Sequence, residues 1–243
     1  MQRRTVLILA GVAGAALLIV GGAFAYILRP SAAPSGEITA IPVQAEDTEA
    51  PLATNTPVEE AEATGPQTFE LIQAESEARF IINEVLRGVD TTVVGVTNQV
   101  AAQILIDIAD PAATQLGPVT VNARTLATDA ESRNRAIRNE ILDTALYEFI
   151  TFTPTELTGL PDAVAVGQSF DFQIVGDLTI RDITTLVTFD VTATLESESR
   201  LVGTASTAVQ RNDYSLTIPN VPQVAGVEEQ VVIEIDFVAA PTS

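Results

Sequence analysis

The chain of 243 residues contains no histidine and no cysteine, and all twelve of its basic residues are arginine. Without histidine or cysteine there is no Ser-His-Asp or Cys-His nucleophile system, no histidine general base and no zinc site of the usual ligands. The absence of lysine excludes a Schiff base, and the absence of cysteine excludes a lipoprotein anchor. We therefore predict that the protein is not an enzyme and uses no cofactor and no metal ion.

Carboxylates are the only side chains left for acid–base chemistry. Asp107 with Asp110, or Glu228 with Glu229, could be interpreted as catalytic pairs. The chain has 32 acidic residues and a formal net charge of −20, so such neighbours are expected from composition alone. The same negative charge argues against nucleic acid as a partner and against adhesion to anionic lipid surfaces.

The N-terminal 29 residues differ from the rest of the chain. Val6–Leu28 is an uncharged apolar run of 23 residues, preceded by Arg3 and Arg4. Such a run is long enough to cross a bilayer as a helix, and the preceding arginines favour a cytoplasmic N-terminus. We predict a single-pass anchor in the cell membrane, with a transmembrane helix at 6–28 and the remaining chain extracytoplasmic. The alternative is a signal peptide cleaved near Ala23–Ala25, which would give a secreted protein.

Residues 30–65 have the composition of a linker. This segment holds five prolines and seven acidic residues and has no aromatic residue. A segment of this kind buries too little apolar surface to offset the entropy of ordering. We predict a disordered, acidic, proline-rich linker between the anchor and a single domain at 66–243.

Strict odd–even alternation marks two long segments of this domain, Phe170–Ile180 and Val187–Leu195. A period of two places apolar side chains on one face of a strand and polar ones on the other. Long, half-buried antiparallel strands are typical of a sheet that curls around an apolar interior. The pattern predicts such a sheet and leaves open whether its interior is packed or holds a ligand.

The rest of the domain is predicted to be almost entirely β. One stretch, Ala130–Tyr147, has helical periodicity, with Asp129 as a plausible N-cap. We expect further strands at Phe69–Gln73, Ser76–Leu86, Thr91–Thr97, Gln99–Ile108, Val119–Arg124, Glu148–Leu157, Leu201–Val209, Tyr214–Ile218 and Val231–Val238. Without a βαβ rhythm, this order predicts an all-β antiparallel barrel or sandwich with one helical insertion.

The predicted helix carries Arg133, Arg135 and Arg138. These side chains could form a cationic rim that receives an acidic head group at the mouth of a barrel. The simpler interpretation, which we favour, is a solvated helix face that balances Glu131 and Glu140.

Several short segments, in this order, carry a resemblance to a known family. They are Ser76–Phe80, Val93–Thr97, Ile106-Asp107, Arg133–Leu142, Tyr147–Phe152, Val175–Ile180, Ile183-Thr184, Val187-Thr188, Arg211–Tyr214 and Val231–Ile235. Together they resemble the YceI-like family of exported, lipocalin-like barrels over roughly Thr68–Ala239. The chain departs from the family pattern at Asp182, where a glycine is usual, at Thr185 and Leu186, where a basic residue and proline are usual, and at Ile82–Glu84, where a histidine often stands.

The resemblance implies an extended antiparallel lipocalin-like β-barrel that holds a polyisoprenoid, or a fatty-acid-like amphiphile, in its lumen. Such a site would be apolar and would select by length and shape. The ligand-binding residues predicted on this basis are Phe80, Ile82, Ile104, Ile106, Phe152, Phe170, Phe172, Ile174, Phe189, Val191, Ile233 and Ile235. Periodicity alone favours simple core packing of the phenylalanines, Phe237 included. The alternative function is a structural barrel with a packed core that binds an envelope partner, and a homodimer is left open.

Overall fold

The structure is a computed structural model and describes residues 30–43, 65–220 and 224–242. The transmembrane helix predicted at 6–28 and the alternative cleavage site near Ala25 both lie outside these residues. Within the described ranges, no helix combines the length and the apolar character needed to cross a membrane.

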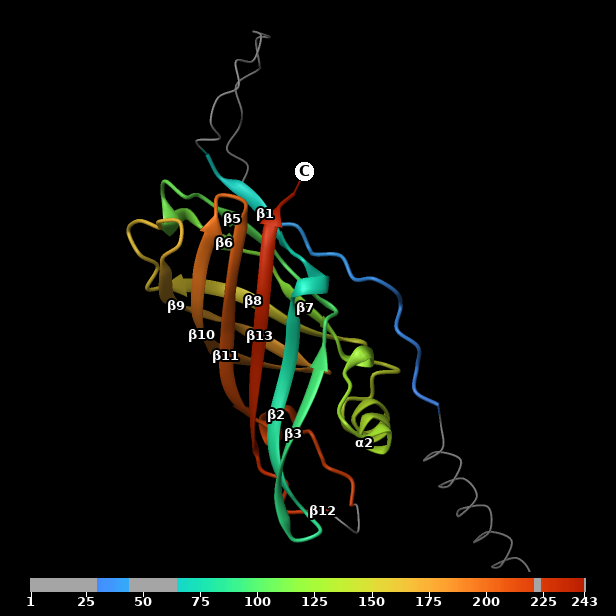
Figure 1. The fold of residues 1–243 in the computed structure, drawn as a ribbon. Helices are drawn as coiled ribbons and strands as arrows, with labels where there is room; N and C mark the ends of the chain where they lie inside the picture. The colour runs from blue at the N-terminus through green and yellow to red at the C-terminus, as the bar shows by residue number, and fades with distance from the viewer. Residues whose placement is uncertain (1–29, 44–64, 221–223, 243) are drawn as a thin grey trace, which may run out of the picture.

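The described residues form a mostly antiparallel β half-barrel with one short α-helix, α2 (Glu131–Ala136) (Figure 1). The strands are β1 (Gln67–Leu71), β2 (Glu77–Leu86), β3 (Val89–Thr97), β4 (Val100–Ala101), β5 (Gln103–Ile106), β6 (Gln115–Leu116), β7 (Val119–Asn122), β8 (Phe149–Thr158), β9 (Ser169–Ile180), β10 (Ile183–Ser197), β11 (Arg200–Gln210), β12 (Val224–Ala225) and β13 (Gln230–Pro241). They form one sheet in the order β4-β7-β8-β9-β10-β11-β13-β1-β5-β6. Beyond β1, the same edge of β13 pairs with β2, which in turn pairs with β3 and β12.

The two alternating segments are β9 and β10, which pair along their whole shared length from Ser169 and Thr194 to Ile180 and Ile183. Their turn is only two residues long, and Arg181 adopts a left-handed φ of 59° to close it. The prediction that alternate residues face the interior is confirmed. The fully buried positions of the two strands are Ile174, Gly176, Leu178, Ile180, Phe189, Val191, Ala193 and Leu195.

The sheet curls because a short connection in the chain joins strands from opposite edges of the sheet. Only Asn98 and Gln99 separate β3 from β4, and β4 pairs with β7 on the far side of the strand order. An isolated bridge between Val96 and Ala127 adds to this connection. The apolar faces of the strands therefore point into a common interior, where most of the buried apolar residues form one cluster.

The helix is much shorter than the predicted span Ala130–Tyr147. The α-helical turns end at Ala136, and a wider turn with a backbone hydrogen bond from Leu142 to Ile137 (2.8 Å) follows. Asp143, with φ of 45°, is left-handed and cannot continue a helix. The predicted N-cap is also wrong, because Ala130 takes that position and Asp129 pairs with Arg133 instead.

The strand predicted at Tyr214–Ile218 is absent from the described residues. Tyr214 ends a 3₁₀ turn that begins at Arg211, and Ser215 follows with a φ of 52°. This left-handed residue redirects the backbone, so the segment packs across the end of the half-barrel. Strand β12, which pairs with β2 there, was not predicted from the sequence.

Residues 30–43 are ordered against the sheet, so the prediction of a disordered linker is wrong for this part of 30–65. Ile38 and Ala40 are buried against Ala101. The Gln73 side chain donates to the Ile38 carbonyl (2.6 Å). Three residues before Ile38, the Ser35 backbone amide donates to Glu148 Oε1 (2.7 Å). The segment, drawn in blue in Figure 1, is held mainly by side-chain hydrogen bonds to its backbone, which composition does not reveal.

Candidate functional site

The interior of the half-barrel contains two adjoining cavities, one of about 520 Å³ and one of about 120 Å³. We call them the large chamber and the small chamber. Residues of β5 and β6 line the small chamber, and residues of β12 line the large one. Strands β5 and β6 lie at the top of the half-barrel in Figure 1, and β12 lies at the bottom. The two chambers therefore occupy opposite ends of the interior along its long axis.

The wall of the small chamber is almost entirely apolar. It is built from strands β1, β5–β11 and β13 and from the segments that carry Pro111 and Val164. Among the described residues, Asp107 is the only charged residue on this wall. Phe170 and Phe172 stack here with their ring centroids 5.8 Å apart. This chamber offers apolar contact and few hydrogen-bonding groups.

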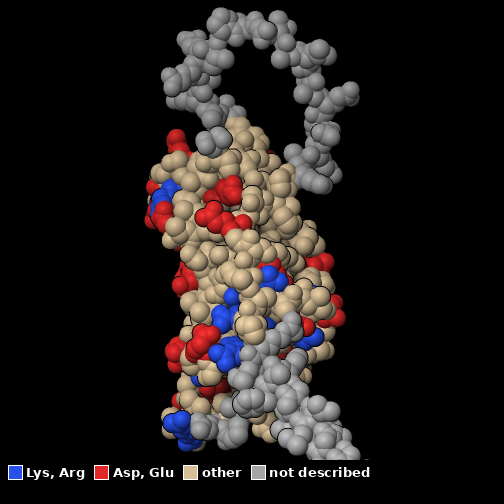
Figure 2. Space-filling model, turned by 90° about the vertical axis from the view of Figure 1, so that its right-hand side faces the viewer, with Lys and Arg blue, Asp and Glu red and all other residues tan. Residues whose placement is uncertain are grey.

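The large chamber combines an apolar wall with a charged end. Its apolar residues come from β2, β3, β7–β13, the 137–142 turn and the segment that follows Tyr214. The charged residues on its wall, among those described, are Arg79, Glu84, Arg87, Arg133 and Arg211. On the face that carries α2, basic side chains gather in the lower half of the molecule between acidic ones (Figure 2).

Four residues belong to both walls and mark the neck between the chambers: Val119, Phe152, Phe189 and Ile235. Phe152 and Phe189 meet edge to face, with centroids 4.9 Å apart and an interplanar angle of 66°. Both rings are buried, with 6% and 3% of their surface exposed. Such an arrangement is favourable for aromatic pairs, so the two rings support each other where the chambers meet.

All twelve predicted site residues lie on the chamber walls, and their contact with a ligand stays a prediction. Those of the small chamber are Ile104, Ile106, Phe170, Phe172, Ile174 and Val191. Those of the large chamber are Phe80, Ile82 and Ile233. Phe152, Phe189 and Ile235 belong to the neck. Alternation predicted that these residues face inward, and the family resemblance gave them as ligand-binding residues.

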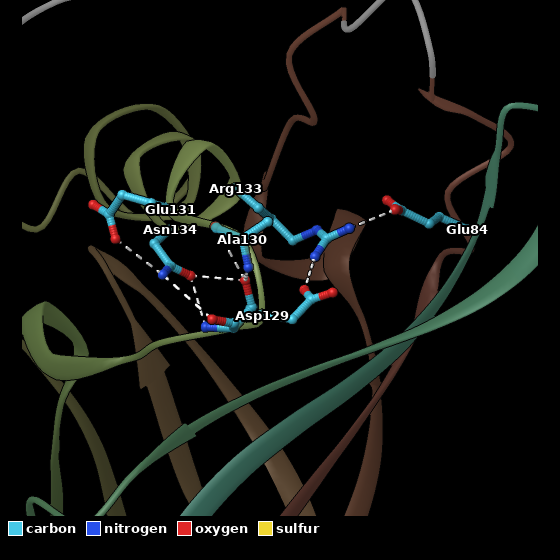
Figure 3. Close-up of polar contacts among 7 residues, drawn as sticks. Glu84, Asp129, Ala130, Glu131, Arg133 and Asn134 are labelled. Carbon is cyan, nitrogen blue, oxygen red and sulfur yellow. Dashed lines mark hydrogen bonds and ion pairs between the residues drawn. The ribbon is translucent and has the colours of Figure 1, made fainter.

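Glu84 is a lumen residue that was missed. It lies on β2 with the same parity as Phe80 and Ile82, so alternation could have placed it inside. Only 8% of its side chain is exposed, and its carboxylate pairs with Arg133 of α2 at 3.0 Å. Arg133 also pairs with Asp129, so one guanidinium joins the helix to the inner face of the sheet (Figure 3). This arrangement neutralises charge that would otherwise be costly to bury.

The loop before α2 is fixed by a buried amide. Asn134, 5% exposed, accepts hydrogen bonds at Oδ1 from the backbone amide (2.6 Å) and the hydroxyl (2.7 Å) of Thr128 (Figure 3). Its amide nitrogen donates to Glu131 (3.3 Å). These bonds hold the start of the helix and so position Arg133 over the large chamber.

The three arginines of the helix differ in role, and the interpretation of a solvated face was wrong for Arg133. Arg135 is exposed, as that interpretation expects. Arg138 pairs with Glu131 at 3.0 Å and donates to the hydroxyl of Ser31 at 3.4 Å. Arg133 alone of the three lines the large chamber.

Two further polar groups border the large chamber. Tyr214 is 1% exposed, and burial raises its pKa, an effect that the nearby Thr185 hydroxyl partly offsets. Its phenol therefore stays neutral at physiological pH. Arg79 donates to Glu234 (2.8 Å) and Asp236 (2.6 Å) across the β2–β13 pair. The bond to Glu234 contributes most to raising the pKa of Arg79, which keeps it cationic.

The sequence matches the YceI-like domain over residues 69–239, which is most of the chain. The chain belongs to the YceI-like family. The resemblance described above is thus confirmed, with nearly the same boundaries.

Two solved structures of similar fold support this assignment. One is a polyisoprenoid binding domain from Saccharophagus degradans implicated in plant cell wall breakdown, at 15% identity and a TM-score of 0.57. It covers 72% of this chain and 99% of its own. The other is Burkholderia cenocepacia BcnA, at 18% identity and a TM-score of 0.54, covering 70% of this chain and 99% of its own. At these identities the likeness shows the fold. A search of curated proteins finds no match.

Proposed function

We propose that this YceI-like domain binds a long apolar chain, a polyisoprenoid or a fatty-acid-like amphiphile, in its lumen without changing it chemically. The observation that carries the proposal is the pair of adjoining chambers with largely apolar walls. The similar domain from Saccharophagus degradans, described as polyisoprenoid binding, supports the choice of ligand class.

The size of the large chamber argues that it is occupied. An empty apolar cavity costs about 24 cal/mol per Å³, so a dry void of about 520 Å³ would cost on the order of 12 kcal/mol. That is as much as the whole stability of many domains. Water or a guest must therefore fill it, and apolar walls favour a hydrocarbon, which gains about 0.8 kcal/mol for each buried methylene.

The charges suggest how an amphiphile lies in the lumen. The small chamber has one charged wall residue, Asp107, whereas the large chamber has Glu84 paired with Arg133, together with Arg87 and Arg211. A polar head group therefore finds more charged hydrogen-bonding partners at the large end. We therefore place the head group in the large chamber, with the tail running through the neck into the small one.

The alternative function, a structural barrel with a packed core, requires a filled interior. The two chambers weigh against it. An acidic surface that binds an envelope partner is compatible with either function, but it gives no reason for an open lumen.

We also propose that the domain works outside the cytoplasm, held at the membrane by the helix predicted at 6–28. Support for this comes from the sequence alone, through the length of the apolar run and the arginines before it. An anchor would keep the lumen near the bilayer, where isoprenoid and acyl chains are found.

A displacement assay on the full-length chain tests the binding function. The probe is cis-parinaric acid, a fatty acid that fluoresces more strongly in an apolar environment. We expect saturable binding at one site and competitive displacement by a polyprenol. A folded chain that neither takes up the probe nor responds to polyprenol would contradict the proposal.

A further inference from the structure

Three phenylalanine rings of the wall lie against glycines of a neighbouring strand. Phe80 covers Gly95, Phe152 covers Gly176, and Phe237 covers Gly203. A Cβ added at any of these glycines would fall within 2.1–2.7 Å of the nearest ring atom. Side chains other than glycine are therefore excluded at each position unless the ring moves.

The pair of Phe80 and Gly95 differs from the other two in what surrounds the glycine. At Gly176 and Gly203 a new Cβ would also meet a backbone carbonyl oxygen, 2.5 Å away in each case. At Gly95 the three nearest atoms all belong to the Phe80 ring, at 2.1, 2.4 and 3.0 Å. The three closest contacts of a methyl group at Gly95 would therefore all be with this ring, and none would be with the backbone.

Strand register fixes where the ring could go. Phe80 lies directly opposite Gly95 on β3 and opposite Ile233 on β13. Both Phe80 and Ile233 line the large chamber, and Gly95 is buried on the same inward face. A ring pushed off Gly95 has Ile233 on its other side, so the free direction is into the chamber.

We propose that Gly95, acting through the Phe80 ring, sets the width of the large chamber and so admits a methyl-branched isoprenoid chain. Because Gly95 has no side chain, the Phe80 ring can lie within the wall. The volume that the ring would take up if a side chain at residue 95 displaced it therefore remains part of the lumen. A branched chain needs a wider passage than a straight one and depends more on this width. The inference rests on the proposed binding function and makes Gly95 a positioning residue for ligand selectivity.

The test compares Gly95→Ala with three reference chains: wild type, Gly65→Ala and Gly95→Ala/Phe80→Leu. Gly65 has no atom within 4 Å of an added Cβ and no left-handed φ, so its substitution controls for the alanine itself. Phe80→Leu removes the ring that the new methyl group would displace. Each full-length chain is titrated with cis-parinaric acid, then with a polyprenol and with a saturated fatty acid as competitors.

We expect Gly95→Ala to weaken polyprenol binding roughly fourfold to fifteenfold, which corresponds to one or two displaced methylene groups. Fatty acid binding should weaken less, and the double variant should regain polyprenol binding. Unchanged selectivity in a folded Gly95→Ala chain would overturn the inference. It would also be overturned if the double variant stayed as weak as the single one, because the loss would then come from the strand and not from the ring.

Two outcomes outside the binding assay also decide the matter. If Gly95→Ala does not fold but the double variant does, the ring is the source of the clash, as we infer; if neither folds, the inference is wrong. A crystal structure of Gly95→Ala should show the Phe80 ring turned into the chamber. The crystal structure tests the ring geometry even if the wild-type chain binds none of the probes. Failure of the wild-type chain to bind would refute the proposed function, whereas an unmoved Phe80 ring in Gly95→Ala would refute the inference about Gly95.

Discussion

Filling the large chamber with the protein's own side chain distinguishes an open lumen from a packed one. Ile82 is half-buried, lines this chamber, and lies opposite the buried Val93 on β3. Tryptophan at this position adds about six heavy atoms, which would displace a similar number of ligand carbons. At about 0.8 kcal/mol per methylene, and with some shift of the ligand, Ile82→Trp should lose roughly 3–4 kcal/mol of binding free energy. Affinity for a polyprenol should therefore fall by a factor of about 10² to 10³.

The same variant should change stability very little. Adding a ring to a packed core typically costs 1–3 kcal/mol, but here the ring enters space that already exists. We expect the free energy of unfolding, measured by urea denaturation of ligand-free protein, to fall by less than about 1 kcal/mol. Displacement of cis-parinaric acid by polyprenol measures the affinity.

Ile81→Trp is the matched control, because Ile81 is the next residue of β2, faces outward and pairs with the exposed Val94. It should leave both affinity and stability near their wild-type values. The reasoning would be refuted if Ile82→Trp destabilised the protein by several kcal/mol and left polyprenol affinity unchanged.

Three further predictions concern the neck, the buried ion pair and the N-terminal segment. Phe189→Leu removes the edge-to-face contact with Phe152 and should lower the free energy of unfolding by about 1–2 kcal/mol. It should also increase the maximum chain length of the fatty acids that compete for binding. If that maximum length does not change, the two rings do not form a neck. Arg133→Met leaves Glu84 buried without its partner and should lower the free energy of unfolding, measured by urea denaturation, by about 2–3 kcal/mol. The double variant Arg133→Met/Glu84→Gln should recover much of this free energy. If it recovers none, the loss is not due to the uncompensated carboxylate. Burial alone would raise the pKa of Glu148, but hydrogen bonds from Ser35 and the charge of Arg124 outweigh it and lower that pKa. A lowered folded-state pKa gives stabilisation that is present at neutral pH and is lost as the pH falls through that value. Residues 30–43 should therefore gain hydrogen-exchange protection as the pH rises from below this lowered pKa to neutral, after correction for the intrinsic exchange rate. An identical gain in Glu148→Gln would contradict this role.

The sequence revealed the wall of the lumen because strand periodicity depends only on which side each residue faces. That is why every predicted site residue lies on a chamber wall. The span of the YceI-like domain was predicted on other grounds, from the order of short segments that resemble the family. Glu84 obeys the same rule, but it was overlooked because only apolar residues were considered as candidates for the interior.

Other features depend on contacts between distant residues and could not be predicted. The left-handed Asp143 ends the helical region early, and nothing in the apolar spacing of 130–147 signals it. The order of residues 30–43 comes from single hydrogen bonds to Gln73, Arg124 and Glu148. The match of Phe80 with Gly95 depends on the register of β2 and β3, which the sequence does not specify.

Native mass spectrometry of the full-length chain, purified without denaturant and compared with a detergent-only blank, tests the central claim most directly. The account predicts a species heavier than the polypeptide by one apolar molecule, which organic solvent releases intact and which Ile82→Trp largely lacks. A folded chain that carries the polypeptide mass alone, and that gains no mass when polyprenol or fatty acid is added, would contradict it.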